Sequence, residues 1–322
     1  MKLKAGFLTA IFIVFGALAP AEQKPRSQEP LPEKVTLCEL KKDPAAYNHK
    51  LIEVTAFVSH GFEDFTLFDP ACSSWPEVWL EYGGTSKSGT MYCCGVTADR
   101  SRPKPLVVEN IPVPLVDDAQ FREFDRLLQR RPDSVVRATI AGRFFAGEQV
   151  KYPKGTFWGG YGHMGCCSLL AIQQVLSVDN QDRPDLDYGA SADQPDIEKT
   201  GCGYRFLTDI RPLDALLKAQ QAAEQAGGEW PFAEPQRVAS DSLARLLNVD
   251  EKTITGLRQT RKAQGRFVYE WRAKAKGASY MVVVSRPYWL SFYAKDPQRV
   301  AWTVIAAYES SCGGNNSVTR IR

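Results

Sequence analysis

The sequence predicts two domains: an all-β, five-stranded barrel with one helix, followed by an α+β antiparallel meander with covering helices. Five strand-type runs and one helical run lie within residues 33–180, and helical runs precede strands within residues 200–322. An acidic segment with two prolines, residues 181–199, separates them and is typical of a linker. Because about 300 residues are long for a single core, two domains are the better expectation.

Charge changes at the same boundaries. Residues 33–180 contain 16 basic residues (Lys and Arg) and 18 acidic residues (Asp and Glu). The linker contains 2 basic and 6 acidic residues, and residues 200–322 contain 18 basic and 11 acidic residues. The second domain is therefore basic, and the linker is its acidic neighbour.

The amino terminus predicts export. Lys2 and Lys4 precede an apolar run over residues 5–19, and Ala19-Pro20-Ala21 fits the small-x-small cleavage pattern of a signal peptide, here residues 1–21. Residues 22–32 then form a disordered leader. The alternative is an uncleaved anchor. Since no second long apolar run follows, we expect an exported protein, periplasmic or extracellular, that is not an integral membrane protein after cleavage.

Strand signals in the first domain arrive in a particular order. Alternating runs at 51–58, 64–69 and 77–82 are followed by a helical run at 117–131 and by strands at 135–145 and 168–178. Three strands, a helix and two strands is the order of an OB (oligonucleotide/oligosaccharide-binding) barrel. Closure also removes exposed strand edges, which favours the barrel over an α+β sandwich.

Several motifs in this region arrive together. Leu-Cys-Glu-Leu opens at Leu37, Pro44 and Tyr47 precede the first strand, Gly-Phe-Glu-Asp begins at Gly61, and Asp-Pro-Ala-Cys begins at Asp69, with "VWLEYG" and "GYGHMGCC" further on. Over residues 35–178 this pattern resembles a family of exported, uncharacterised bacterial proteins with an OB-like domain. The resemblance implies the fold and export, supplies no active-site residues, and leaves the C-terminal domain uncovered.

The barrel order indicates where a ligand would bind. In OB barrels the loops after the first and fourth strands border the usual ligand surface, here residues 59–64 and 146–167. Aromatic and imidazole rings there and on the third strand could stack on sugars or bases. Alternatively, they cap the open end of the barrel. These candidates are Phe62, Trp79, Tyr82, Trp158, Tyr161 and His163.

Eight cysteines in an exported chain predict a disulfide framework. Cys202 and Cys312, the only two after the linker, are expected to pair with each other. The first-domain cysteines are Cys38, Cys72, Cys93, Cys94, Cys166 and Cys167, and their partners stay undetermined. The adjacent pairs favour cross-links that tie one long loop to another or to the Cys38 and Cys72 segments. A zinc or copper site with His163 and a redox centre are the alternatives.

The sequence favours a non-catalytic binding or structural protein of the cell envelope. No nucleophile elbow, zinc-protease motif or phosphate-binding loop occurs, and no catalytic group, metal or cofactor is predicted. The partner would be a saccharide, a protein or an anionic polymer. The alternative function is a metal- or thiol-dependent envelope enzyme that uses His163 and the adjacent cysteines.

The pattern of the second domain predicts a helix at 211–228 and two short helices within 240–262 on either side of residues 248–251, then strands at 266–276, 279–295 and 299–312. Helices are expected on one face of its sheet and a basic, solvated face, with Arg266 and Arg272, on the other. That face would be simply hydrated, attract an anionic partner, or be crossed by the acidic linker. Residues 240–262 also fit a helix-turn-helix with Asn248 at the turn, although export disfavours nucleic acid as a partner.

Overall fold

The structure is a computed structural model. It describes residues 30–61, 64–72, 76–85, 101–130, 134–153, 155–179, 183, 185–189, 204–208, 213–273 and 278–310. By internal contacts the chain divides into Met1–Leu31 and Pro32–Arg322, and every helix and strand named below lies in the second unit. The expected signal peptide lies outside the described residues. The boundary at residues 181–199 stays a prediction.

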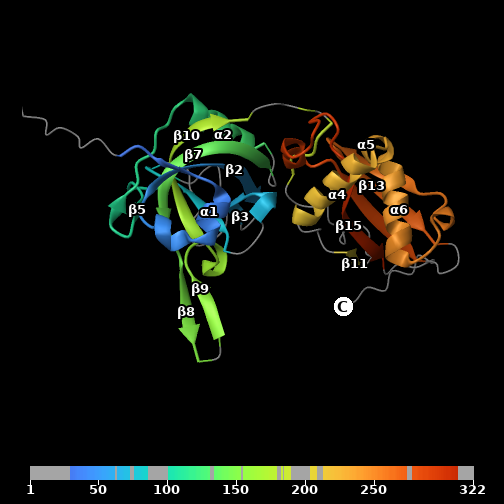
Figure 1. Ribbon diagram of the computed structural model, residues 1–322, viewed down its shortest axis with the longest axis horizontal. Coiled ribbons are helices and arrows are strands. Elements are labelled where there is room, and N and C mark those ends of the chain that lie inside the picture. Colours follow the sequence, from blue (N-terminus) through green and yellow to red (C-terminus); the bar gives the residue numbers. More distant parts are fainter. Residues whose placement is uncertain are drawn as a thin grey trace, which may run out of the picture. The chain divides into compact units, whose positions relative to one another are not determined.

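Five strands of the first sheet close into a barrel (Figure 1). They are β2 (Leu51–Gly61), β3 (Asp64–Phe68), β4 (Val78–Tyr82), β10 (Ser168–Val178) and β7 (Val135–Phe145), and β7 pairs back onto β2. β10 runs parallel to β4, whereas the other neighbours around the barrel are antiparallel. The predicted closed barrel is therefore confirmed, and its strand order is consistent with an OB-like barrel. A short sixth strand, β1 (Glu33–Val35), pairs parallel to β2.

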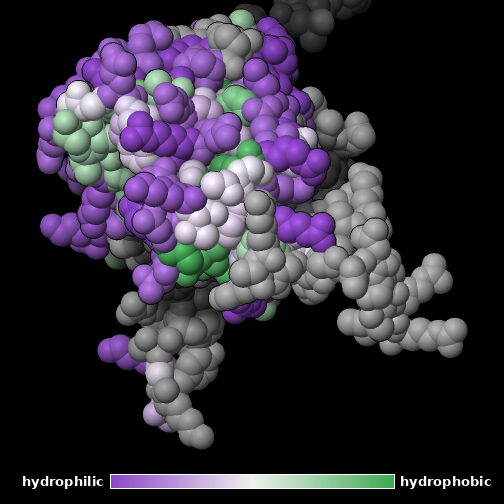
Figure 2. Space-filling view, turned by 90° about the vertical axis from the view of Figure 1, so that its right-hand side faces the viewer, coloured by the Kyte–Doolittle hydropathy of each residue, from purple (hydrophilic) through white to green (hydrophobic). Residues whose placement is uncertain are grey.

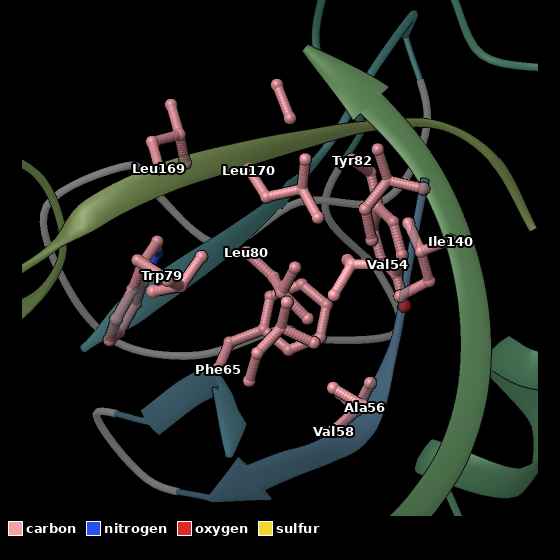
Figure 3. Close-up of a cluster of buried hydrophobic side chains, with 14 of the residues drawn as sticks. Val54, Ala56, Val58, Phe65, Trp79, Leu80, Tyr82, Ile140, Leu169 and Leu170 are labelled. Carbon is pink, nitrogen blue, oxygen red and sulfur yellow. The ribbon is translucent and has the colours of Figure 1, made fainter. Parts of the chain in front are cut away.

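The barrel is closed around large apolar side chains. Residues 52, 54, 56 and 58 of β2 are all buried, as the alternation predicts, and Phe65, Leu80 and Ile140 join them in the core (Figure 3). β7 and β10 approach closely at Gly142, where an added Cβ would lie 2.5 Å from the carbonyl oxygen of Ala171. Only glycine fits there, so this position fixes the spacing of β7 and β10.

Two helices accompany the barrel. α2 (Ala119–Leu128) lies within the predicted helical run, and the Asp118 side chain caps it by accepting from the amide of Phe121 at 2.9 Å. Its Phe121, Phe124 and Leu128 are buried, as the helical spacing predicts. α1 (Leu37–Lys42) is not among the predicted elements. It begins with a capping box between Thr36 and Glu39 and contains the Leu-Cys-Glu-Leu motif.

Short elements fill the expected loops. β5 (Val107–Val108) and β6 (Ile111–Pro112) form one hairpin, and β8 (Glu148–Tyr152) and β9 (Gly155–Gly159) form a second that extends from the barrel (Figure 1). The sequence treats the region from 146 to 167 as a loop, so the β8–β9 hairpin corrects that interpretation. One-turn 3-10 helices complete this part: η1 (Pro44–Tyr47), η2 (Pro70–Cys72) and η3 (His163–Gly165).

A five-stranded antiparallel sheet forms the C-terminal part, in the order β11-β15-β14-β13-β12. Its strands are β11 (Tyr204–Thr208), β15 (Thr303–Ser310), β14 (Ser279–Ser285), β13 (Arg266–Arg272) and β12 (Arg258–Ala263). The accompanying helices are α4 (Leu213–Ala226), α5 (Trp230–Ala233), α6 (Pro235–Leu247), η4 (Glu251–Thr253) and η5 (Tyr288–Phe292). The predicted meander of three strands is present, and two edge strands extend it.

One predicted helix of the second domain is absent from the described residues, and one predicted strand is shorter than expected. α6 stops at Leu247 because Asn248 adopts the left-handed conformation, φ 53°, and caps the helix end. The chain continues into η4 and the edge strand β12, so the second helix of a helix-turn-helix is absent from this described stretch. The expected strand at 279–295 likewise ends at Ser285, and after Pro287 the chain turns into η5.

The C-terminal sheet is covered on both faces. Tyr269 and Trp271 pack against Val238 and Leu243 of α6 on one face. On the other, Val268 belongs to a separate buried cluster that includes Met281, Val283, Leu186, Tyr188 and Trp289. The face expected to be basic and in water is therefore covered around Val268 and Arg266, which is only 5% exposed, whereas Arg272 at the end of β13 is exposed as expected.

Part of the predicted acidic linker packs into this sheet. The Asp187 amide donates to the Arg286 carbonyl at 2.7 Å, and the Asp187 carboxylate accepts from Arg266 Nε and from the Ser285 hydroxyl, each at 2.7 Å. Gly265, with φ +60°, gives room for this segment because an added Cβ would lie 2.1 Å from the Asp187 nitrogen. Residues 185–189 are thus a structural part of the sheet's covering layer.

Candidate functional site

An open pocket of about 570 Å³ lies on the barrel beside the β8–β9 hairpin. Its polar side chains are Asn48, Glu109, Glu148 and Tyr161, and its remaining wall is made of small residues, among them Gly147, Gly159 and Gly160. These residues come from the end of η1, the β5–β6 turn and both ends of the β8–β9 hairpin. The volume is in the usual range of small-molecule sites.

Glu109 is held between two partners. Its Oε2 lies 2.6 Å from His49 Nε2, and its Oε1 accepts a hydrogen bond from the Tyr161 hydroxyl at 2.6 Å. Glu109 and Asn110 form the two-residue turn between β5 and β6, and both have positive φ, 48° and 64°. Two-residue hairpin turns require such angles, and asparagine tolerates them. The turn thus presents the Glu109 carboxylate to the pocket.

His49 is fixed through both its backbone and its ring. Its φ is 63°, its carbonyl accepts from Arg143 Nη1 at 2.9 Å, and its ring meets Phe145 edge-on at 5.7 Å. A non-glycine residue with positive φ is uncommon and is retained where neighbouring contacts require it. The His49–Glu109–Tyr161 cluster is therefore a pre-arranged polar wall.

The hydrogen bonds of this cluster favour the charged carboxylate. The Tyr161 hydroxyl makes the largest contribution to lowering the pKa of Glu109, partial burial opposes it, and the His49 hydrogen bond and charge lower the pKa further. Glu148, which also lines the pocket, is exposed. The pocket therefore offers acceptor groups and negative charge to a ligand.

We expect the Tyr161→Phe substitution to reduce stability most at neutral pH. The lowered pKa of Glu109 stabilises the folded state above the ordinary glutamate pKa, and this contribution is lost as pH falls through the folded-state value. The difference in melting temperature between wild type and variant should therefore shrink between about pH 6 and pH 3. Thermal unfolding followed by circular dichroism across that range measures it. A difference that is constant with pH would contradict the assignment.

Two of the predicted ligand residues are core residues instead. Trp79 is 2% exposed and Tyr82 is fully buried (Figure 3), because β4 is a barrel strand that pairs with β3 and β10 and all five of its residues are buried. Tyr82 meets Phe121 of α2 edge-on at 5.3 Å. Neither ring presents a face on which a ligand could stack, which corrects the expected platform at these positions.

The other candidates have different outcomes. Tyr161 lines the pocket, although it contributes its hydroxyl and not a stacking face. His163 is partly buried in η3 and is not a lining residue of this pocket. Phe62 and the side chain of Trp158 fall outside the described part of the chain. Residues 59–61, from the other expected loop, do not line the pocket.

Sequence reasoning misses Asn48 and Glu109 as pocket residues, and it includes Glu148 only as part of the expected ligand loop 146–167. A signal exists for Glu109, since Glu-Asn stands between Val107-Val108 and Ile111, a two-residue turn between apolar residues. Nothing local connects that turn to Tyr161, which lies 52 residues further along the chain.

The disulfides differ from the expected cross-links between loops. Cys38 bonds to Cys72, with Cα atoms 5.4 Å apart, and joins α1 to η2. Cys166 bonds to its neighbour Cys167, with Cα atoms 3.7 Å apart. Neither bond ties one long loop to another. The other four cysteines, including the expected Cys202–Cys312 pair, are outside the described residues.

Metal ligation finds limited support in the described part of the chain. Two groups of suitable side chains occur there, Cys38 with Asp69 and Cys72, and Glu77 with Cys166 and Cys167. All four cysteines are in disulfides, so they offer no thiolate in this oxidation state. Neither group includes His163, the residue expected to take part in a metal site.

No family model, curated protein or solved structure matches this chain. The fold and the pocket therefore define its class: a closed β-barrel with an acidic pocket at one hairpin, followed by an antiparallel sheet covered on both faces. Figure 2, which faces the right-hand side of Figure 1, shows a mainly hydrophilic face with small hydrophobic areas. Among the described helices, none has the length and apolar character to cross a membrane.

Proposed function

We propose that the protein is an exported, non-catalytic binding protein that takes a small hydroxylated ligand, of the saccharide class, in the barrel pocket. The observation that carries this proposal is the fixed Glu109 carboxylate beside Tyr161 and Asn48, in an open pocket with glycine walls. The pocket adjoins the region after the fourth barrel strand, which supports the ligand surface expected for an OB-like barrel.

The chemistry of the pocket favours hydroxyl groups. A carboxylate accepts hydrogen bonds from two neighbouring hydroxyls, and hydrogen bonds to charged groups are stronger than neutral ones. The amide of Asn48 both donates and accepts. Gly147, Gly159 and Gly160 carry no side chain, so a ligand can approach the chain closely along this wall.

The same charges disfavour two of the partners that the sequence leaves open. Glu109 and Glu148 would repel the phosphates of nucleic acid or the acidic groups of an anionic polymer. A neutral or amino-bearing saccharide meets no such repulsion. Export is supported by the pattern of residues 1–21 and by two disulfides, since disulfides persist in oxidising compartments.

We expect the Glu148→Gln and Glu109→Gln variants to bind saccharide about tenfold more weakly or worse, because a charge-assisted hydrogen bond contributes about 1.5–3 kcal/mol. A panel of neutral and amino sugars, from mono- to tetrasaccharides, is screened first on wild type, and the best binder is then measured by calorimetry. Glu123→Gln, on the outer face of α2 and away from the pocket, is the matched control and should bind as wild type does.

Glu148→Gln is the more informative of the two pocket variants. Because Glu148 is exposed, removal of its charge should leave the fold intact. Binding by wild type that both pocket variants retain would place the ligand elsewhere. If the wild-type protein binds no sugar of the panel, the proposal that the ligand is a saccharide is contradicted.

A further inference from the structure

The Cys166–Cys167 disulfide lies directly behind the pocket wall. Tyr161 and Cys167 form an isolated antiparallel bridge, with the Tyr161 amide donating to the Cys167 carbonyl at 2.8 Å and the Cys167 amide donating to the Tyr161 carbonyl at 2.9 Å. Between them the chain turns tightly, with positive φ at Gly162, Met164 and Gly165. The disulfide is thus part of a small closed loop whose first residue is the pocket tyrosine.

The two sulfurs differ in access. Cys166 is partly exposed, whereas Cys167 is fully buried. Thiol–disulfide exchange requires a thiolate to approach one sulfur in line with the bond while the other sulfur leaves. Cys166 is therefore the sulfur open to attack, and Cys167 is the leaving group.

A carboxyl group stands beside the leaving sulfur. A Glu77 carboxylate oxygen and both sulfurs lie within 4.8 Å of one another, and the Ser168 amide donates to the Glu77 carbonyl at 3.0 Å, which holds the two segments together. Although Glu77 as a whole residue is exposed, desolvation of its carboxyl group raises its pKa, the charge of Asp64 raises the pKa further, and Lys41 opposes both. A protonated Glu77 is therefore more available than an ordinary glutamic acid would be.

We propose that Cys166–Cys167 is a redox-active disulfide, reduced by a dithiol with Glu77 as proton donor to Cys167, and that its reduction loosens the Tyr161 wall of the pocket. The regulatory part rests on the proposed function, whereas the redox step does not.

The reaction balances as an exchange of two electrons and two protons. A thiolate of the dithiol attacks Cys166 Sγ, a mixed disulfide forms, and the Cys166–Cys167 bond breaks. Cys167 Sγ leaves with the bonding electron pair and takes a proton from Glu77, directly or through one water. The second thiol of the reductant then attacks the reductant sulfur that is bonded to Cys166 Sγ in the mixed disulfide. This step releases Cys166 as a thiol. The dithiol becomes a cyclic disulfide, and solvent reprotonates Glu77.

Reduction has a structural consequence because the cross-link restrains the turn. With the bond open, the ring that Cys166 and Cys167 form is released, and the two hydrogen bonds between Tyr161 and Cys167 lose the support of that rigid ring. The Tyr161 hydroxyl, which fixes Glu109, moves with that segment. A ligand bound through Glu109 should then bind more weakly.

The redox step is tested on the native full-length protein with dithiothreitol. Samples are alkylated at intervals, and peptide mapping reports each cysteine separately. We expect Cys166 and Cys167 to react faster than Cys38 and Cys72, which are also partly exposed and lie beside the Asp69 carboxylate, and which therefore serve as an internal control of similar access. Equal or slower reaction of Cys166 and Cys167 would overturn the proposal.

Two further measurements test the role of Glu77 and the structural response. Glu77→Gln should slow the reduction of Cys166–Cys167 by roughly tenfold, because the amide has no acidic proton to transfer, while Glu123→Gln should not. Hydrogen exchange of the Tyr161 and Cys167 amides should accelerate on reduction. Unchanged exchange would remove the coupling to the pocket, and an unchanged rate in Glu77→Gln would remove Glu77 as the proton donor.

These readouts need no ligand, so they separate the two proposals. Rapid reduction with faster amide exchange, in a protein that binds no sugar of the panel, would contradict the proposed function and support the redox step. Saccharide binding that is equal in the oxidised and reduced protein would support the proposed function and contradict its regulation.

Discussion

Replacing Trp79 with alanine is expected to lower the free energy of unfolding by about 3–5 kcal/mol. Trp79 is 2% exposed and lies on β4, which is paired with β3 on one side and with β10 on the other. An added Cβ at Gly162 would lie 2.7 Å from its ring, so the loop packs closely over it as well. Since strands on both sides fix the site, the structure cannot collapse into the cavity. Urea unfolding followed by circular dichroism measures the loss.

The control is Met164→Ala, since Met164 is 86% exposed in the adjacent loop. That change should cost less than about 0.5 kcal/mol. Similar losses in both variants would mean that the Trp79 ring is not a core side chain. Saccharide binding by the folded Trp79→Ala protein should remain within about threefold of wild type, well short of the loss of about 1–3 kcal/mol expected for a stacking ring. This measurement distinguishes packing from the stacking role that the sequence leaves open.

Replacing Asp187 with asparagine is expected to destabilise the protein by about 3–5 kcal/mol, because it removes the negative charge from its buried ion pair with Arg266. The side chains of Arg266 and Asp187 are 5% and 1% exposed, and the distance from Arg266 Nε to Asp187 Oδ2 is 2.7 Å. The effect should appear in urea unfolding as a lower midpoint with an unchanged slope.

The matched control is Glu270→Gln, which breaks an exposed pair with Arg258 on the same sheet, where the side chains of Arg258 and Glu270 are 77% and 47% exposed. Exposed pairs contribute about 0–1 kcal/mol. The double variant Arg266→Met with Asp187→Asn should be more stable than the sum of the two single losses predicts, since no buried charge remains. An Asp187→Asn loss no larger than that of Glu270→Gln would contradict the buried pair.

The barrel strands are predictable because alternation is a local property. The predicted bounds of β7 and β10 agree with the structure, and the helical run contains α2. α1 escapes prediction since six residues are too few for a periodic pattern, although Thr36 and Glu39 carry the capping-box spacing. The edge strand β12 escapes it because Arg258–Ala263 is mostly polar and exposed, and only its pairing with β13 makes it a strand.

The site is only partly predictable, because its residues are distant in the sequence. Tyr161 is a candidate through its place in a glycine-rich loop. Glu109 lies 60 residues from His49 and 52 from Tyr161, and only barrel closure brings the three together. The adjacent cysteines are expected to reach other loops, whereas the tight turn after Tyr161 places their sulfurs against each other.

The sequence by itself determined the closed barrel and its strand order, since these follow from residue alternation and from the order of strands and helix. Tertiary structure alone decided which polar groups meet and which surfaces stay open. Trp79 and Arg266 show the reason most clearly. Alternation says which side of a strand a residue occupies, but whether that side faces water depends on what packs over it. For these two residues the covering segments are the Gly162 loop and residues 185–189.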